Sequence, residues 1–319
     1  MAHVAARADL DVGVLCAHDT AGFGQTEPPA QLHELTLEHN GRRVSPAVLE
    51  HACVLTDRST ADAHVIFCGH SMGCISAVFS AADWISRGHV VPSVLLIAPA
   101  IAATAPAGKS NRFDLATVWC VRTLFAVLGA VRACGSAGAA VIRVLVFALT
   151  RLHFFWPYAL AVFYSFGQGL PTARTAAQYA SWTHGGRPNW IRSLMAFIDA
   201  NVWRAWCDPQ RGERQQRGGR RGERRKQGER RSSINRVDAS VTTLMGELHA
   251  AGARVLIIHD DSDVLVPLAN SMRLAAALPP GAVSLEVVRG SGHMPHETDV
   301  EALTALLLRH ALLREAVGS

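Results

Sequence analysis

Five short apolar runs, rich in β-branched residues, predict buried β-strands along the chain. Runs of this length without a regular apolar–polar alternation are typical of strands covered on both faces of a parallel sheet. They lie at residues 12–17 (VGVLCA), 64–69 (HVIFCG), 93–98 (SVLLIA), 254–259 (RVLIIH) and 283–288 (VSLEVV).

Longer segments with helical spacing of apolar residues lie between these runs. The clearest predicted helices cover residues 73–87, 268–277 and 298–315. A repeated order of strand followed by helix indicates the α/β class, in which helices flank a mostly parallel sheet. The 319 residues are enough to bury a full core.

The middle of the chain interrupts this alternation and predicts an inserted helical cap. Residues 101–207 are apolar and helix-like, and 153–166 (HFFWPYALAVFYSF) form the densest aromatic stretch, which suits the core of a lid or the lining of an apolar pocket. Arginines divide the apolar part into runs too short to span a membrane, and a lid or a membrane-surface helix fits better. These arginines are Arg122, Arg132, Arg143 and Arg151.

An arginine-rich segment at 208–235 follows the cap. Residues 211–231 hold ten Arg or Lys against three Glu, a local charge of +7, whereas the whole chain carries +5, which leaves −2 for the rest. With almost no apolar residue, the segment is predicted to be a disordered loop. It also lacks interleaved aromatics, so we expect no nucleic acid as a partner. The predicted division is therefore 1–100 and 236–319 for the two parts of the core, 101–207 for the cap and 208–235 for the loop.

Cysteine usage and the amino-terminal sequence bear on the compartment. The chain has seven cysteines without CxxC spacing, and Cys16, Cys68 and Cys74 lie in or beside apolar runs, which predicts small buried thiols. The first residues, MAHVAARADLD, lack the apolar stretch of a secretory signal. We expect a reducing compartment, the cytoplasm or an organelle interior, with membrane association through the cap as an alternative.

The stretch GHSMG places Ser71 between Gly69 and Gly73, directly after an apolar strand and before a helix. A serine at such a sharp turn needs strained backbone angles, and side chains on its neighbours would collide with the strand and helix. The turn would lift the hydroxyl above the sheet. The N–H of Met72 would then face a developing oxyanion.

A serine hydroxyl needs a base and a group that orients that base. The sequence supplies candidates after two later strands: Asp263 in HDDSDVLVP and His293 in GSGHMPHE. The carboxyl ends of parallel strands share one edge of a sheet, so Ser71, Asp263 and His293 can meet there.

Other residues compete for these roles. The acid could be Asp260 or Asp261, and His296 competes with His293, although we expect His296 to cap or pack at a helix start. Two further histidines, His18 and His70, border the same crevice and could touch substrate. We expect structural roles for His18 and His70, and a loop-fixing role for Asp19.

These segments resemble the α/β-hydrolase fold superfamily in its common serine-hydrolase branch. AHDTAGFGQTEPP at 17–29 similarly resembles the family pattern D-x-x-G-x-G-x-[ST]. The resemblance covers roughly residues 12–100 and 236–315. It implies that Ser71 attacks, that His293 acts as general base and then acid, that Asp263 orients His293, and that the Met72 N–H donates to the oxyanion.

The start of the sequence departs from that family pattern. Members normally have two or three strands before the one predicted at 12–17, with a His-Gly loop that gives a second oxyanion donor. The sequence begins almost at the fourth strand, which predicts an N-terminally shortened form or a protein with half its oxyanion hole. One lost donor typically lowers the rate by about 10² to 10³.

Two functions follow as hypotheses. The first is a serine hydrolase that cleaves a carboxylic ester or lipid-like acyl substrate through an acyl-enzyme, with no cofactor or metal. The second is a catalytically impaired relative that serves as a binding or membrane-surface module. Ser71 in the nucleophile position argues against epoxide or haloalkane hydrolysis, for which family members generally use a carboxylate.

Overall fold

The structure, a computed structural model, describes residues 34–59, 64–101, 233–263 and 266–315, with isolated positions between 14 and 29 and between 135 and 144. At residues 233–240 and 310–315 the structure describes the backbone alone. The predictions of a strand at 12–17, of most of the cap at 101–207 and of a disordered loop at 208–232 lie outside these residues.

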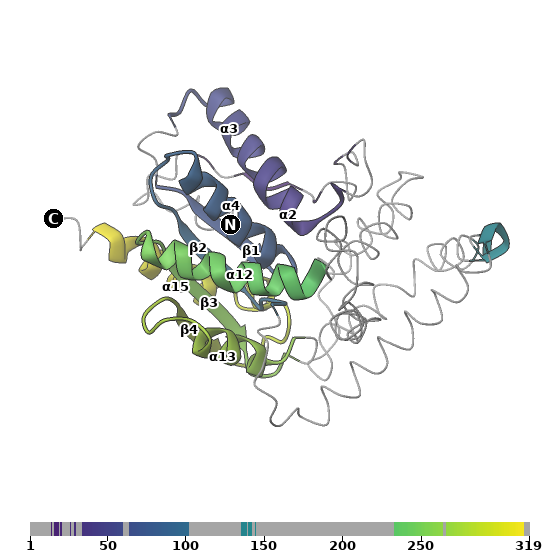
Figure 1. Ribbon diagram of the computed structural model, residues 1–319. Helices are drawn as coiled ribbons and strands as arrows, with labels where there is room; N and C mark the ends of the chain where they lie inside the picture. Colours follow the sequence, from purple (N-terminus) through teal and green to yellow (C-terminus); the bar gives the residue numbers. More distant parts are fainter. Residues whose placement is uncertain are drawn as a thin grey trace, which may run out of the picture.

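Four parallel strands form the sheet of the described core (Figure 1). Their order in the sheet follows their order in the sequence, and every neighbouring pair is parallel. Each begins or ends within two residues of its predicted bounds. The strands are β1 (Ile66–His70), β2 (Ser93–Ile97), β3 (Arg254–Asp260) and β4 (Ser284–Val288).

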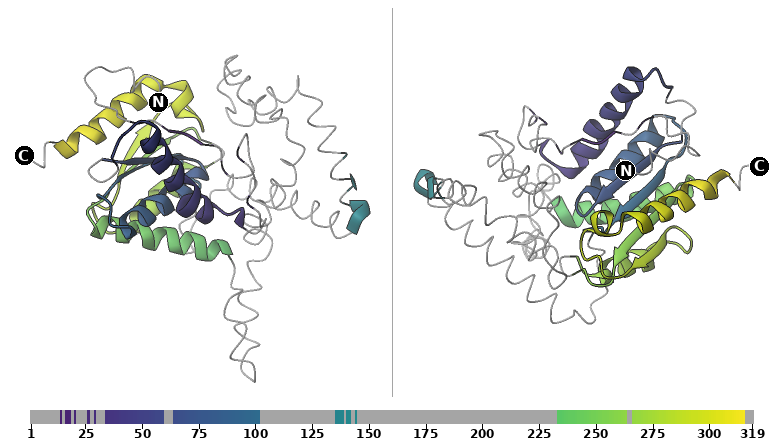
Figure 2. Two further views of the ribbon diagram at one scale, coloured as in Figure 1. Left: turned by 90° about the horizontal axis from the view of Figure 1, so that it is seen from above. Right: turned by 180° about the vertical axis from the view of Figure 1, so that it is seen from behind.

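Helices cover both faces of this sheet, which confirms the α/β class. On one face α4 (Gly73–Ser86), α12 (Ser233–Ala250) and α13 (Leu268–Ala276) share a core with Val94 and Ile257. On the other, α15 (Val300–Glu315) packs Leu303 and Leu307 against the centre of the sheet, and Figure 2 shows it crossing the side opposite α4 and α12. The short helix α14 (Pro295–Thr298) precedes α15, and α12 begins within the range 208–235 that was predicted as a loop.

Burial on both faces holds only for the two central strands. β2 is buried throughout and β3 is buried from Val255 onward, whereas β4 is only partly covered. β1 and β4 lie at the two edges of the described sheet, and α15 covers its centre. Cys68 is exposed because β1 is one of these edge strands, and Cys16 is exposed as well. Of the three thiols that were predicted to be buried, Cys74 alone is buried.

Residues 37–55 form a helical segment that the hydrophobic pattern did not predict. It comprises α2 (Leu37–His39), the π-helical turn η2 (Asn40–Val44) and α3 (Ser45–Leu55). Two buried serines of α4 donate to its backbone: Ser76 Oγ to Leu37 O at 2.9 Å and Ser80 Oγ to Gly41 O at 3.0 Å. These bonds satisfy carbonyls in a buried contact.

Gly41 allows this close approach, and its replacement is expected to destabilise the fold. A Cβ at Gly41 would lie 2.4 Å from Ser76 O and 2.6 Å from Phe79 Cβ. Since the first of these atoms belongs to the backbone of α4, the two helices would have to separate. We expect Gly41→Ala to lower the free energy of unfolding in urea by about 1–3 kcal/mol.

Gly246, inside α12, is the matched control for this substitution. Among the described residues no heavy atom lies within 4 Å of a Cβ built there. Gly246→Ala should raise the free energy of unfolding by up to about 1 kcal/mol through helix propensity. Equal effects of the two substitutions would contradict the contact argument.

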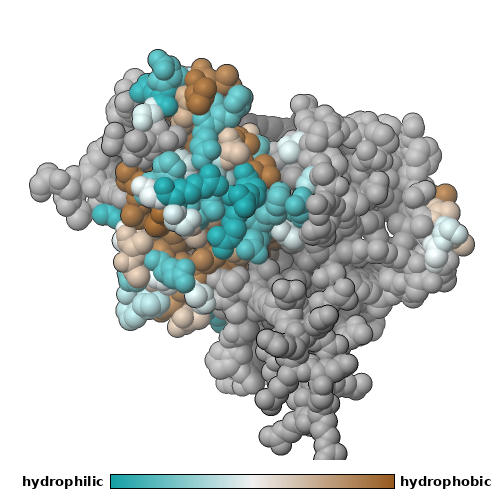
Figure 3. All heavy atoms as spheres, turned by 45° about the horizontal axis from the view of Figure 1, so that its top comes forward, coloured by the Kyte–Doolittle hydropathy of each residue, from teal (hydrophilic) through white to brown (hydrophobic). Residues whose placement is uncertain are grey.

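The surface of the described core is mainly polar on the face drawn in Figure 3, where hydrophilic side chains form a broad patch between smaller hydrophobic areas. Of the large apolar residues whose side chains the structure describes, Val54 and Leu55, at the end of α3, are the most exposed. In the part of the chain that is described, no helix combines the length and the apolar character needed to cross a bilayer.

Candidate active site

Ser71 lies on the turn between β1 and α4 with a left-handed backbone, φ 53°. Few residues other than glycine adopt this conformation, and strain of this kind is typical of functional turns. The turn is held from both sides, because Ser71 N donates to Ile97 O at 2.9 Å and Ala100 N donates to Ser71 O at 3.1 Å. The surrounding backbone therefore fixes the strained serine at the end of the sheet.

The two glycines that flank this turn are not equivalent. A Cβ on Gly69 would lie 2.5 Å from Gly73 O and 2.6 Å from the Cys74 backbone, so the strand and the helix can meet here only with glycine. The predicted need for glycine is thus confirmed at Gly69. At Gly73 the prediction of a collision is wrong within the described residues, because a Cβ there meets no heavy atom within 4 Å.

Met72 follows Ser71 as the residue that precedes α4. Its own backbone is helical, with φ −64° and ψ −27°, and its carbonyl accepts from Ile75 N at 3.1 Å. The amino end of a helix carries partial positive charge, so the backbone N–H groups here favour a negative ligand. The oxyanion role of the Met72 N–H stays a prediction.

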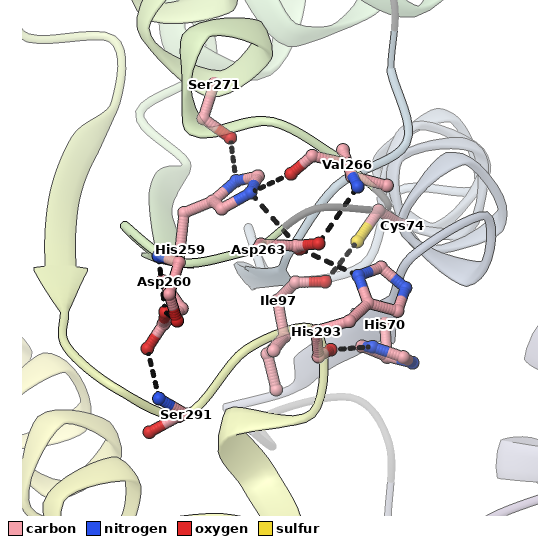
Figure 4. Close-up of polar contacts among 11 residues, drawn as sticks. His70, Cys74, Ile97, His259, Asp260, Asp263, Val266, Ser271, Ser291 and His293 are labelled. Atoms are coloured by element: carbon pink, nitrogen blue, oxygen red, sulfur yellow. Dashed lines mark hydrogen bonds and ion pairs between the residues drawn. The ribbon is translucent and has the colours of Figure 1, made fainter. Parts of the chain in front are cut away.

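Asp263 and His293 meet at the edge of the sheet where β3 and β4 end (Figure 4). His293 Nδ1 donates to Asp263 Oδ2 at 2.7 Å, and both side chains are almost completely buried. Gly292 precedes the histidine with φ 62°, a value that favours glycine, which makes this sharp loop possible. With Nδ1 as the donor, Nε2 is the nitrogen left to accept a proton.

Asp260 and Asp261, the other two candidates for the acid, have different partners from Asp263. Asp260 is fully buried and accepts from the backbone of Ser291 at 2.6 Å and from Ser262, so it ties the end of β3 to the loop that carries His293. Asp261 is exposed and lies 3.8 Å from Arg289. Of the three predicted acids, Asp263 is the one that contacts His293.

Asp263 is held as a carboxylate. Burial alone would raise its pKa, but hydrogen bonds from His259, His293 and the Val266 N–H outweigh this effect and keep the pKa of Asp263 well below its usual range. The Val266 bond is 2.9 Å long, on the oxygen that does not face His293. At neutral pH the group therefore carries the full negative charge that an imidazolium at His293 would need.

His70 and His296 flank His293. His70 Nε2 donates to the backbone carbonyl of His293 at 2.8 Å, and its ring centroid lies 4.8 Å from that of His293 and 4.5 Å from that of His296. Burial, aided by the neighbouring histidines, lowers the pKa of His70 to about 3, and burial together with His293 lowers the pKa of His296 to about 4. Both rings are neutral at physiological pH. The packing role expected for His296 agrees with this position in α14.

His70 also joins the serine turn to the histidine loop, since it is the residue before Ser71. Among the described residues there is no hydrogen bond from the Ser71 hydroxyl to the His293 ring, so this contact of the predicted triad stays a prediction. Side-chain bonds of catalytic groups are often long before substrate binds.

Two further residues were predicted to have structural roles. A ring nitrogen of His18, Nε2, lies 2.9 Å from Ser45 Oγ, within hydrogen-bond distance, and Asp19 lies outside the described residues.

His259 is a residue of the site that the sequence reasoning missed. It was assigned only to a buried strand, yet its ring nitrogens contact Ser271 Oγ and Val266 O, each at 2.6 Å, and Nε2 lies 3.4 Å from Asp263 Oδ2. The signal was present, because a titratable side chain inside the apolar run RVLIIH must find polar partners. Within the described ranges, no group of three His, Cys, Asp or Glu side chains is arranged to hold a metal ion.

The site and the sheet together identify the architecture. A strained serine follows β1, an acid follows β3, a histidine follows β4, and all three strands are parallel. This is the arrangement of the α/β-hydrolase fold.

No protein-family model and no curated protein sequence matches the chain. Solved structures similar to it include a 2-hydroxy-6-oxo-6-phenylhexa-2,4-dienoate hydrolase from Rhodococcus sp. strain RHA1, with 14% identity, 92% of this chain and 77% of that chain covered, and a TM-score of 0.49. An esterase from Rhodococcus sp. ECU1013 has 13% identity, coverage of 92% and 78%, and a TM-score of 0.47. A structure from a study of carboxylesterases of Nitrososphaera gargenis has 16% identity, coverage of 93% and 79%, and a TM-score of 0.48.

Proposed function

We propose that this protein is a serine hydrolase that cleaves a carboxylic ester or lipid-like acyl substrate. The observation that carries the proposal is the left-handed Ser71 turn at the same sheet edge as a buried carboxylate–imidazole pair with a bond of 2.7 Å. A structural turn alone gives no reason to hold a serine in a strained conformation beside such a pair.

In the proposed reaction Ser71 Oγ attacks the carbonyl carbon of the ester while His293 Nε2 takes the hydroxyl proton. The resulting oxyanion accepts from the Met72 N–H, and Asp263 stabilises the imidazolium through Nδ1–H. When the tetrahedral intermediate collapses, His293 returns the proton to the leaving alkoxide, which departs as the alcohol. His293 then removes a proton from water as the water oxygen attacks the acyl carbon. When this second intermediate collapses, the bond from the acyl carbon to Ser71 Oγ breaks, His293 gives its proton to Ser71 Oγ, and the carboxylic acid leaves.

The two polar connections around His293 support this assignment of roles. Asp263 fixes the tautomer that leaves Nε2 as the base, and His70 holds the His293 backbone next to the serine turn. The preference for an apolar acyl substrate rests on the aromatic sequence at 153–166 alone.

Labelling with a fluorophosphonate probe tests the proposal without a known substrate. The probe phosphonylates only a serine that a base activates, so we expect one adduct per chain, located at Ser71 by peptide mass spectrometry. Ser71→Ala should abolish the adduct, while Ser262→Ala, in the acid loop, should retain it. A folded protein that stays unlabelled, with no hydrolysis of short p-nitrophenyl esters, would reject the acyl-enzyme mechanism and favour the binding-module alternative.

A further inference from the structure

The buried imidazole of His259 has no part in the mechanism above, yet its contacts reach the acid of the proposed triad. His259 lies near the end of β3, is 0% exposed and is one of the largest fully buried side chains of the described core. An imidazole that exchanges water for protein contacts on both nitrogens must be held by well-placed partners.

The partners of His259 determine where its protons lie. Nε2 is 2.6 Å from the carbonyl oxygen of Val266, which can only accept, so Nε2 carries a hydrogen. Nδ1 is 2.6 Å from Ser271 Oγ of α13, and this hydroxyl is fully buried too. The ring is therefore fixed at one end by a helix and at the other by the loop that carries the acid.

The same Nε2–H also faces Asp263. Its nitrogen lies 3.4 Å from Asp263 Oδ2, the oxygen that accepts the 2.7 Å bond from His293. Figure 4 shows the Asp263 carboxylate between the two imidazoles, with the His259 ring on the side of α13 and the His293 ring on the opposite side. The Nε2–H of His259 is shared between two acceptors. Its bond to Val266 O is the shorter and therefore the stronger, and its contact with Asp263 Oδ2 is longer and weaker.

Val266 closes the loop around the acid, since its N–H donates to the other carboxylate oxygen at 2.9 Å while its carbonyl accepts from His259. Among the described residues the carboxylate has three N–H neighbours, and His259 supports two of these contacts, one directly and one through Val266.

We propose that His259 is a positioning residue, which holds Asp263 in the orientation that meets His293 Nδ1 and withdraws charge from the oxygen that the two imidazoles share. That this positioning serves catalysis rests on the proposed function. That one carboxylate lies in contact with two imidazoles does not depend on it. Because a carboxylate with one donor fewer is more basic and attracts a neighbouring imidazolium more strongly, loss of the His259 N–H should raise the pKa of His293.

Asparagine and glutamine at position 259 form a matched pair for the test. The amide nitrogen of glutamine reaches about as far as imidazole Nε2, so His259→Gln keeps a donor toward Val266 and Asp263. The amide of asparagine reaches only as far as Nδ1, so His259→Asn keeps a partner for Ser271 but leaves the acid loop without its donor. Both variants keep a polar group at this position, and asparagine, the smaller of the two, leaves the larger space beside the acid loop.

The readout is the titration of His293 by NMR of protein labelled with 15N in its histidines, which needs neither substrate nor turnover. The signal is assigned with a His293→Gln variant, and the rings of His70 and His296, which also face His293, are assigned in the same way. We expect the pKa of His293 to rise by about half a unit or more in His259→Asn and to stay within about 0.2 units of the wild-type value in His259→Gln.

The other outcomes overturn the inference. An unchanged or lowered His293 pKa in His259→Asn, or equal shifts in both variants, would assign His259 to packing alone. If His259→Asn does not fold, Ser271→Ala replaces it. This variant keeps the Nε2–H of His259 but removes the hydroxyl that holds Nδ1, so the ring is less well fixed against Asp263, and a smaller rise in the same direction is expected. An unchanged or lowered value in this variant would likewise assign His259 to packing alone. Fluorophosphonate labelling of the wild-type protein tests the proposed function separately, so a failed titration and a failed function are told apart.

Discussion

Asp263→Asn is expected to reduce kcat/KM for p-nitrophenyl esters by about 10⁴-fold while the protein still folds, if the proposed triad operates. Within the described part of the chain, the Asp263 carboxylate faces three N–H groups, from Val266, His259 and His293. An asparagine offers one oxygen and one NH₂ in the same space. Since all three neighbours are donors, its NH₂ must face at least one of them.

The least costly way to relieve that conflict changes the tautomer of His293. If the NH₂ of the introduced amide faces His293, the ring must accept at Nδ1 and carry its proton on Nε2, where it can no longer receive the serine proton. The loss should therefore fall on kcat, with a smaller effect on KM.

Asp261→Asn is the matched control, because Asp261 lies two residues away on the same loop and its side chain is exposed. That side chain makes a 3.8 Å ion pair with the exposed Arg289, and the backbone bond from Asp261 N to Val288 O is kept in the variant. It should keep activity within about twofold, as is usual for an exposed charge. Steady-state kinetics of both variants, with thermal unfolding followed by circular dichroism, make the comparison. An Asp263→Asn enzyme within tenfold of the wild type would remove Asp263 from the mechanism.

The hydrophobic pattern of the sequence predicted the four described strands and the helices α4, α13 and α15, because burial alone determines where their apolar residues lie. It did not predict α12, which begins within the range assigned to a loop. The central residues of the runs, 94–98 and 255–258, are all apolar because helices cover both faces of β2 and β3. The segment 37–55 was missed for a physical reason. Its π-helical turn and its contact with α4 depend on Gly41 and on serine-to-carbonyl bonds across 39 residues, which no local pattern encodes.

The candidate site was predicted to a similar extent. The glycine spacing located Ser71, and the order of strand ends brought Asp263 and His293 forward as candidates. The choice between Asp260 and Asp263 could not be made from spacing alone, because both are buried at the end of β3. It depends on which way each side chain leaves the strand: Asp260 turns to Ser291 and Asp263 to His293. The links through His70 and His259 depend in the same way on contacts between distant segments.

The stability of the protein is expected to fall by roughly 2–4 kcal/mol between pH 8 and pH 5, because two partly buried histidines, His70 and His296, resist protonation in the folded state. The pKa of His70 is lowered to about 3 and that of His296 to about 4, against about 6.5 in an unfolded chain. Below pH 6.5 the unfolded chain therefore binds more protons than the folded one. Stability is fully present above that pH and decreases as the pH falls toward 4 and 3.

The contribution of Asp263 to stability changes at a lower pH than that of the two histidines, so it does not affect this measurement. Because its folded pKa lies below the unfolded value of about 3.9, its contribution is fully present above that pH and is lost only at more acidic values. A loss of stability between pH 6.5 and pH 5 consequently reports on the histidines.

His296→Phe isolates one of the two groups, since phenylalanine keeps a ring against His70 but cannot titrate. His296 Nδ1 is buried without a hydrogen-bond partner among the described residues, so this change removes a desolvated polar atom and should itself raise stability at acidic pH. Urea unfolding at pH 8 and pH 5 should show a drop smaller by about 2 kcal/mol than in the wild type. His51→Gln, at an exposed position of α3, should leave the drop unchanged. If His296→Phe loses as much stability as the wild type between these two pH values, the surroundings of His296 do not hold its imidazole neutral. The close packing of His70 and His296 beside His293 would then not explain the pH dependence.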